Sequence, residues 1–305
     1  MQNGEMKFAG IGVVAGALGD EPRQAVQRAR GAKFGGIQFD VKMGGLDLTE
    51  LSDSGRREFA KMLRDGGVTL IAVRADAGAD GLAPGTDVDR ALWRMQKALE
   101  TAAGLGCATV CLDLGRLPVP STAAMERPKI TAEQAGVILL PEPIRTPAPV
   151  ATPLPPPDPQ FVGQVDEGLR TIGSWADRYG VTVALRSSLS PFSAVRRAVD
   201  AAACAWFGLD FDPVDALQDA MDLDAIFSGL GGVVRHVRAR DAVRGERGRV
   251  QAAAVGKGSV EWLGILSRLE ASGYGGWITV DSLELPQRQA GAIDARNYLA
   301  NLITA

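Results

Sequence analysis

The sequence repeats one unit eight times: a short apolar run, a polar loop and a longer amphipathic stretch. The apolar runs are nearly continuous in Val, Ile, Leu and Ala, which is typical of parallel strands that are covered on both faces. We predict these strands at residues 8–14, 36–40, 68–74, 108–112, 181–185, 207–211, 233–237 and 277–280. Eight strand–helix units predict a single (β/α)8 TIM barrel over residues 1–305, and the chain is long enough to close one.

A doubly wound open sheet is the alternative fold. It normally carries a glycine-rich phosphate-binding turn after an early strand. The early glycine clusters at residues 10–12 and 35–36 do not provide that turn in the right context, so we favour the barrel. The clearest helix covers residues 87–103, and we expect Thr86 to cap it and Gly104 to end it.

One proline-rich segment, residues 115–162, interrupts the pattern after the fourth strand and holds 12 of the 17 prolines. Polyproline-like chain buries little, so we interpret the segment as an insertion that leaves the barrel at its C-terminal face. A stiff surface excursion is the simpler interpretation. The alternative is a lid or an interface arm, in which residues 136–140 supply an apolar anchor.

Composition and charge exclude several classes of partner. A net charge of -3 does not indicate a nucleic acid or an anionic membrane as partner. No run reaches the roughly 18 apolar residues of a transmembrane helix, and we interpret the apolar stretch at residues 8–18 as the first strand rather than a signal peptide. The three cysteines are too few for a disulfide framework and suit the reducing cytoplasm. The sequence is compatible with a homo-oligomer.

Charged residues occur at the ends of seven of the predicted strands, with alternating sign. In chain order they are Asp40, Arg74, Asp113, Arg186, Asp212, Arg238 and Asp281. A parallel barrel brings all its strand ends to one mouth, where a charge is costly unless it is paired or meets a polar ligand. The sequence therefore predicts a ligand site at this mouth.

Four motifs in the second half of the chain resemble those of a known family. They are a Gly-Val strand at residues 178–185, an Asp-Pro strand end at 208–213, a His strand with Asp at 235–241, and a C-terminal run at 255–281. Together they resemble the sugar phosphate isomerase/epimerase family, also described as xylose isomerase-like barrels. The resemblance covers most of the chain outside the proline-rich insertion, and it implies the barrel fold.

The resemblance also implies a divalent metal, held by Glu, Asp, His and Glu from four strand ends, with carboxylates that transfer a proton beside it. At these positions the sequence has Arg186, Asp212, Arg238 and Asp281. An arginine has no acceptor atom and cannot coordinate a cation. We therefore expect the family's metal cofactor to be absent. Proton transfer is in doubt as well, because Arg186 replaces one carboxylate and Asp281 is a methylene shorter than Glu.

Three interpretations of the mouth stay open. In the first, Arg186 and Arg238 clamp an anionic ligand, helped by a basic loop with Arg247 and Lys257. In the second, the arginines and aspartates pair with one another as an ion network. In the third, a displaced metal site uses a different set of ligands. That set is Asp210, Asp212, His236 and Asp281.

The single histidine, His236, has two interpretations: a general base, or a buried residue bonded to Asp210 on the next strand, which we favour. We predict Asp212 and Asp281 as catalytic residues. The predicted substrate-binding residues are Arg186, Arg238, Asp40, Arg74, His236, Arg247 and Lys257.

The resulting functional prediction is an isomerase/epimerase-like barrel with a degraded metal site. It would isomerise, or only bind, a small anionic or polyhydroxylated molecule such as a sugar phosphate. The alternative is a catalytically inactive barrel that serves as a binding or scaffolding protein.

Overall fold

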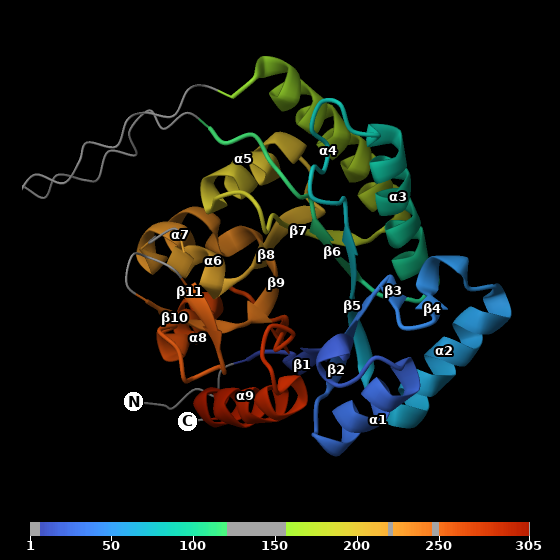
Figure 1. Cartoon of the computed structure of the whole chain (residues 1–305), viewed down its shortest axis with the longest axis vertical. Coiled ribbons are helices and arrows are strands. Elements are labelled where there is room, and N and C mark those ends of the chain that lie inside the picture. The colour runs from blue at the N-terminus through green and yellow to red at the C-terminus, as the bar shows by residue number, and fades with distance from the viewer. Residues whose placement is uncertain (1–6, 121–156, 219–221, 246–249, 305) are drawn as a thin grey trace, which may run out of the picture.

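The computed structural model describes residues 7–120, 157–218, 222–245 and 250–304 and forms a closed barrel of parallel strands (Figure 1). Around the barrel the strand order is β1-β12-β9-β8-β7-β6-β5-β2. These strands are β1 (Gly10–Val14), β2 (Gly36–Asp40), β5 (Thr69–Asp76), β6 (Thr109–Asp113), β7 (Thr182–Arg186), β8 (Phe207–Phe211), β9 (Val234–Ala239) and β12 (Trp277–Val280). The predicted (β/α)8 fold is confirmed, with strand ends shifted by a residue or two at several positions.

Helices surround the barrel and cover its outer face (Figure 1). They are α1 (Pro22–Gly31), α2 (Asp53–Gly66), α3 (Val88–Gly104), α4 (Pro159–Tyr179), α5 (Phe192–Ala202), α6 (Pro213–Gln218), α7 (Leu223–Leu230), α8 (Trp262–Ala271) and α9 (Arg288–Ile303). The clearest example is α3, which buries an apolar stripe containing Met95 and Leu99 against the barrel. None of the helices in the described part of the chain combines the length and the apolar character needed to cross a membrane.

The loops at the C-terminal ends of two strands contain short elements. After β2 the chain forms a small hairpin of β3 (Lys42–Met43) and β4 (Leu46–Asp47), followed by the 3-10 turn η2 (Leu48–Glu50). After β9 it forms a second hairpin of β10 (Asp241–Arg244) and β11 (Val250–Ala253). Two further 3-10 turns, η1 (Ala15–Ala17) and η3 (Gly231–Val233), lie at barrel connections.

The start of α3 differs from the sequence prediction. Asp87, rather than Thr86, is the N-cap, and its carboxylate accepts a hydrogen bond from the backbone N–H of Arg90 at 3.0 Å. The Thr86 hydroxyl instead donates to the carbonyl of Ala83 at 2.7 Å and closes the preceding turn. Thr86 and Asp87 were both suitable N-cap residues, and Asp87 caps the helix because the Thr86 hydroxyl is used in the preceding turn. The predicted end at Gly104 is confirmed.

The proline-rich insertion ends earlier than residue 162. Residues 159–162 already belong to α4, with Pro159 in its first turn and the Asp158 carboxylate accepting from the N–H of Gln160 at 2.9 Å. Proline favours the first turn of a helix because the N–H that it lacks has no partner there. Residues 121–156, including the apolar anchor predicted at 136–140, lie outside the described residues.

The middle layer of the barrel interior consists of small side chains rather than the bulky branched ones common in such barrels. Ala72, Cys111 and Ala184 form a separate buried cluster there. Near the N-terminal end the indole of Trp277 lies against Gly36, where an added Cβ would approach it to 3.0 Å. Small residues in the middle layer leave room for charged side chains from the strand ends above.

Candidate functional site

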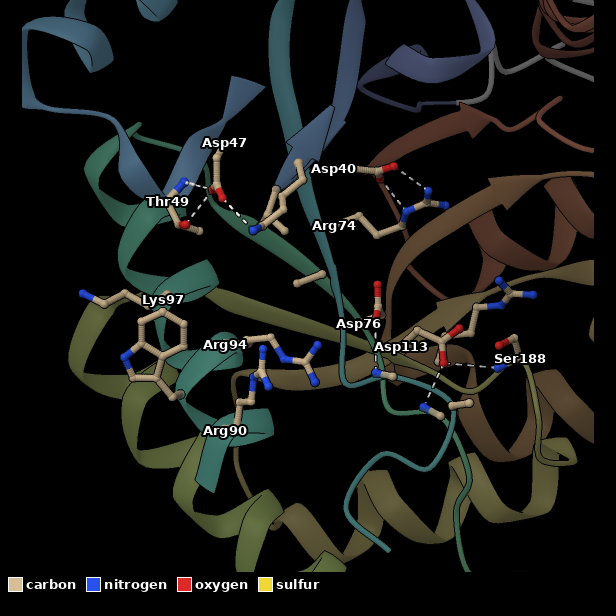
Figure 2. A pocket seen from close by; sticks show the side chains of 18 of the residues that line it. Asp40, Asp47, Thr49, Arg74, Asp76, Arg90, Arg94, Lys97, Asp113 and Ser188 are labelled. Atoms are coloured by element: carbon tan, nitrogen blue, oxygen red, sulfur yellow. Dashed lines mark hydrogen bonds and ion pairs between the residues drawn. The ribbon is translucent and has the colours of Figure 1, made fainter. Parts of the chain in front are cut away.

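The charged strand ends meet at one mouth, as predicted, beside a cavity of about 700 Å³ (Figure 2). Arg74, Arg186 and Arg238 line the cavity, together with Asp40 and Asp113. The sheet register alternates their signs, with Asp40 level with Arg74 and Asp113 level with Arg186. By contrast, Asp212, Asp281 and His236 are not among the cavity-lining residues; Asp212 and His236 are buried, and the Asp281 side chain is 7% exposed.

Arg238 lies between two buried carboxylates. Its side chain is 3% exposed, its Nε donates to Oδ2 of Asp210 at 2.8 Å, and its Nη1 donates to Oδ2 of Asp281 at 2.9 Å. Burial by itself would lower the pKa of Arg238, but Asp210 and Asp281 outweigh it and raise that pKa well above its usual value. Burial would likewise raise the pKa of Asp210, but Arg238 and His236 hold it well below its usual range. Arg238 and Asp210 are therefore both charged.

His236 is a buried member of the same network. Its Nδ1 is 2.6 Å from Oδ1 of Asp210, and its Nε2 is 2.9 Å from the Thr279 hydroxyl. Both ring nitrogens are therefore engaged with protein groups, below the cavity. The favoured interpretation, a buried histidine bonded to Asp210, is confirmed by this contact. The geometry does not favour the general-base interpretation, because the ring has no open path to a ligand.

The potential metal ligands in this layer are Cys111, Asp210 and His236, whose ligand atoms lie within 4.8 Å of one another. They do not fit a metal ion. The Asp210 oxygens already accept from His236 and Arg238. Burial raises the pKa of the Cys111 thiol well above its usual value, which opposes the thiolate that a metal requires. A cation here would also stand beside the Arg238 guanidinium.

Arg186 is the centre of a second ion network. Its Nε and Nη2 donate to the two carboxylate oxygens of Asp215 at 3.0 and 3.1 Å, and Nη2 also lies 3.2 Å from Asp212. On the other side of Asp212, Arg240 approaches Oδ2 to 2.5 Å and also pairs with Glu284 at 2.6 Å. Burial and the charge of Asp212 raise the pKa of Asp215 to about 6, although Arg186 acts against this.

A third pair joins the strands at the outer edge of the mouth. Arg74 donates to Asp40 through Nε at 2.5 Å and through Nη2 at 2.7 Å, which is the bidentate geometry of a strong arginine–carboxylate pair. Its Nη1 is also 3.9 Å from Asp281, so the pair connects to the Arg238 network. All three arginines of the predicted ring are thus ion-paired with protein carboxylates.

The basic loop after β9 does not contribute described side chains to the cavity. Lys257 is exposed and is not among the cavity-lining residues. Arg247 lies outside the described residues. The described part of the loop is instead organised by Asp241, a buried carboxylate that accepts hydrogen bonds from four backbone N–H groups. The donors are Ala242, Gly256, Gly258 and Val260, at 2.8 to 3.3 Å.

Replacing Asp241 by alanine should lower the free energy of unfolding by about 2 kcal/mol, because the N–H groups at Gly256, Gly258 and Val260 lose their acceptor. The loop should also become more sensitive to proteolysis after residue 244. Urea denaturation and limited trypsin digestion would measure both effects. The exposed Asp20→Ala is a matched control that should change neither. An Asp241 variant as stable as the wild type would contradict the role assigned to this carboxylate.

The other wall of the cavity is a face of α3 that the strand-end pattern did not reveal. Arg90, Trp93, Arg94 and Lys97 line the cavity from this helix. Their spacing of three and four residues places them on one face. The same spacing in the sequence, away from the Met95 and Leu99 stripe, was the available signal. The structure also adds Arg240, Asp215 and Glu284 to the charged mouth.

Fold and site together define the class of protein. A closed barrel of parallel strands, with a cavity at their carboxyl ends, is the arrangement of (β/α)8 proteins that act on or bind small molecules at that end. The family model for xylose isomerase-like TIM barrels matches residues 26–302. The chain therefore belongs to the xylose isomerase-like TIM barrel family, which confirms the resemblance drawn from its motifs.

Solved structures share this fold at low sequence identity. The xylose isomerase domain protein from Planctomyces limnophilus is 16% identical, with a TM-score of 0.70 and 98% of each chain covered. A xylose isomerase-like TIM barrel protein from Mycobacterium smegmatis, in complex with magnesium, is 15% identical, with a TM-score of 0.66 over 92% of this chain and 88% of that one. An L-ribulose 3-epimerase is 14% identical, with a TM-score of 0.67 over 97% and 95%. No curated protein matches the chain.

Proposed function

We propose that this barrel has given up the metal-dependent chemistry that the family resemblance implies, and that it binds a small anionic, polyhydroxylated molecule at its C-terminal mouth. One observation carries the proposal. Two of the four positions expected to hold the metal are arginines, and their guanidinium groups pair with the carboxylates at the other two: Arg186 with Asp212, which is retained, and Arg238 with Asp281, which replaces a Glu.

Electrostatics support the loss of the metal. A divalent cation among these groups would have to displace Arg238 from Asp281 and Arg186 from Asp212. It would then stand beside two positive charges, and each repels it by roughly 3 kcal/mol per unit charge product at about 5 Å and an effective dielectric near 20. The displaced metal site meets the same obstacle. Of its four ligands, Asp210 and Asp281 already bind Arg238, and Asp212 binds Arg240.

The proposal also revises the predicted catalytic pair. Asp212 is buried, the Asp281 side chain is 7% exposed, both are ion-paired, and neither is among the cavity-lining residues. A general acid or base must reach the proton that it transfers. Binding without the family's proton transfer is therefore the function that the geometry supports best, which corresponds to the alternative interpretation of the sequence. The cavity volume of about 700 Å³ suits a small-molecule ligand.

A second candidate function, metal-independent isomerisation, is favoured by two other carboxylates. Asp76 and Asp113 end β5 and β6, are level with each other in the sheet, and line the cavity. Each accepts backbone N–H bonds through Oδ1, and within the described residues neither forms an ion pair. These carboxylates can meet a ligand hydroxyl. Turnover of a bound sugar phosphate that is lost in Asp113→Asn, with binding retained, would favour this candidate over simple binding.

Metal analysis tests the proposal directly. We expect purified protein to contain well below one equivalent of manganese, zinc, magnesium or cobalt per chain, and we expect its melting temperature to stay the same when EDTA or excess Mn²⁺ is added. A ligand that binds only the folded state would raise that temperature. Elemental analysis and thermal denaturation provide the measurements. One tightly held metal per chain, removed by EDTA with a fall in melting temperature, would overturn the proposal.

A further inference from the structure

We propose that the oxyanion of the ligand binds to one face of α3, formed by Arg90, Trp93, Arg94 and Lys97 and here called the α3 wall, and not to the arginines at the strand ends. The inference deepens the proposed function and depends on it, since it names the part of the cavity that selects the ligand. The observations behind it are the charges left unpaired in the cavity and the exposed indole among them.

The α3 wall is held in place by the opposite side of the helix. Met95 and Leu99 are fully buried against the barrel, so the face that carries Arg90 and Arg94 turns toward the cavity. Figure 2 shows Arg90 and Arg94 next to each other on α3, with Arg94 directed toward Asp76 and Asp113, whereas Lys97 extends in the other direction. A rigid helix therefore presents the arginines at a fixed position relative to the strand ends.

Most of the basic side chains in the cavity are already neutralised by a carboxylate. Lys42 pairs with Asp47 at 2.9 Å and Lys97 with Glu100 at 2.9 Å. The strand-end arginines have the pairs described above. These are Arg74 with Asp40, Arg186 with Asp212 and Asp215, and Arg238 with Asp210 and Asp281. A ligand anion would have to compete with a protein carboxylate at each of these positions.

Arg90 and Arg94 differ from this group. The guanidinium of Arg94 donates to the backbone carbonyl of Ala77 at 3.1 Å, and the described residues provide no carboxylate for either arginine. Two guanidinium groups one helical turn apart can both donate to a single phosphate or carboxylate. The positive charge that is available to a ligand therefore lies on the α3 wall, which disfavours a clamp made by Arg186 and Arg238.

The indole of Trp93 gives the α3 wall a second property. Its side chain is 52% exposed, and Leu189 on the opposite rim is 56% exposed. Both line the cavity, so they offer it two exposed apolar surfaces. An exposed indole beside two arginines suits a ring that stacks on its face while the attached oxyanion binds the guanidinium groups.

The ligand class follows from the α3 wall together with the carboxylates at the strand ends. The α3 wall binds an oxyanion on a ring, and the unpaired carboxylates of Asp76 and Asp113 accept hydrogen bonds from hydroxyl groups. The ligand is therefore a hydroxylated ring that carries one phosphate or carboxylate. The two sources of the oxyanion share this chemistry, and binding measurements with one probe of each kind distinguish them.

The test compares three probes by isothermal titration calorimetry on the full-length protein: glucose 6-phosphate, quinate and uncharged glucose. We expect at least one of the two anions to bind and glucose to bind at least about tenfold more weakly. In Arg90→Gln/Arg94→Gln the anion should lose at least about tenfold in affinity, and Trp93→Ala should lose affinity while Trp93→Phe keeps most of it. Arg170→Gln, an exposed arginine on α4 away from the cavity, is the matched control.

The possible results separate the two proposals. Wild-type binding that survives unchanged in Arg90→Gln/Arg94→Gln, or equal affinity for glucose and the anions, would overturn the α3 wall and leave the proposed binding function standing. Binding of none of the probes by correctly folded wild-type protein would overturn the proposed function, and the α3 wall with it. Loss of binding in Arg170→Gln as well would show a general charge effect and would also count against the α3 wall.

Discussion

Replacing Arg238 by alanine should destabilise the folded protein by about 3–5 kcal/mol, the cost of leaving a buried charge without its partner. The substitution removes the guanidinium that lies between Asp210 and Asp281, whose side chains are 1% and 7% exposed. Two carboxylates would then remain close together in a dry part of the barrel. Urea denaturation followed by circular dichroism would measure the loss as a lower midpoint.

Two further variants make this result specific to the charge pair. Arg170→Ala removes an exposed arginine from α4 and should change stability by less than about 0.5 kcal/mol. Arg238→Met combined with Asp210→Asn and Asp281→Asn removes the guanidinium and both carboxylates, so it should recover part of the loss. An Arg238→Ala protein within about 1 kcal/mol of the wild type would show that the carboxylates need no cation.

The fold could be predicted because its signals are local. Apolar strands alternating with amphipathic helices require a parallel sheet, and the length and the number of units favour closure. The mouth could be predicted for a related reason, since parallel strands bring residues such as Arg186 and Arg238 to one end. Even Arg240, which was missed, continues the alternating positions of His236 and Arg238 along β9.

The pairing of the charges could not be predicted, because it depends on geometry that no strand contains by itself. A register shift at Ile37/Gln38 and another at Leu209/Asp210 determine which strand ends are level. Asp215 comes from a helix and Glu284 from a loop, so neither belonged to the strand-end pattern. The α3 wall was missed because a helix face becomes a cavity wall only when the loops around it are placed.

The stability of the protein should have an acid limit that depends on the Arg238 network. Burial acts to raise the pKa of Asp281, but Arg238 and Arg74 lower it; burial acts likewise on Asp210, whose pKa is lowered by Arg238 and His236. In the unfolded chain both carboxyls titrate near pH 3.9, above their pKa values in the folded protein. Around that pH the unfolded state therefore binds more protons than the folded state. Their stabilisation is therefore present above about pH 4 and is lost as pH falls through the folded pKa values.

The acid limit should be measured as unfolding midpoints in urea between pH 7 and pH 2.5. Asp281→Asn is the informative variant, because it removes one of the two titrating groups and keeps a side chain of similar size. It should be less stable than the wild type at neutral pH and should lose less on acidification. Equal losses in the variant and the wild type would assign the acid limit to other carboxylates.

Asp215 should act in the opposite direction and move the stability maximum below neutral pH. Its pKa is raised to about 6, so between about pH 4 and pH 6 the folded state binds more protons than the unfolded state. The stabilisation from this group is complete below the unfolded pKa and is lost as pH rises through about 6. Together with the acid limit, this predicts a maximum at about pH 4–5. Asp215→Asn should flatten the decline above the maximum, whereas a wild-type stability that rises steadily from pH 4 to pH 7 would contradict it.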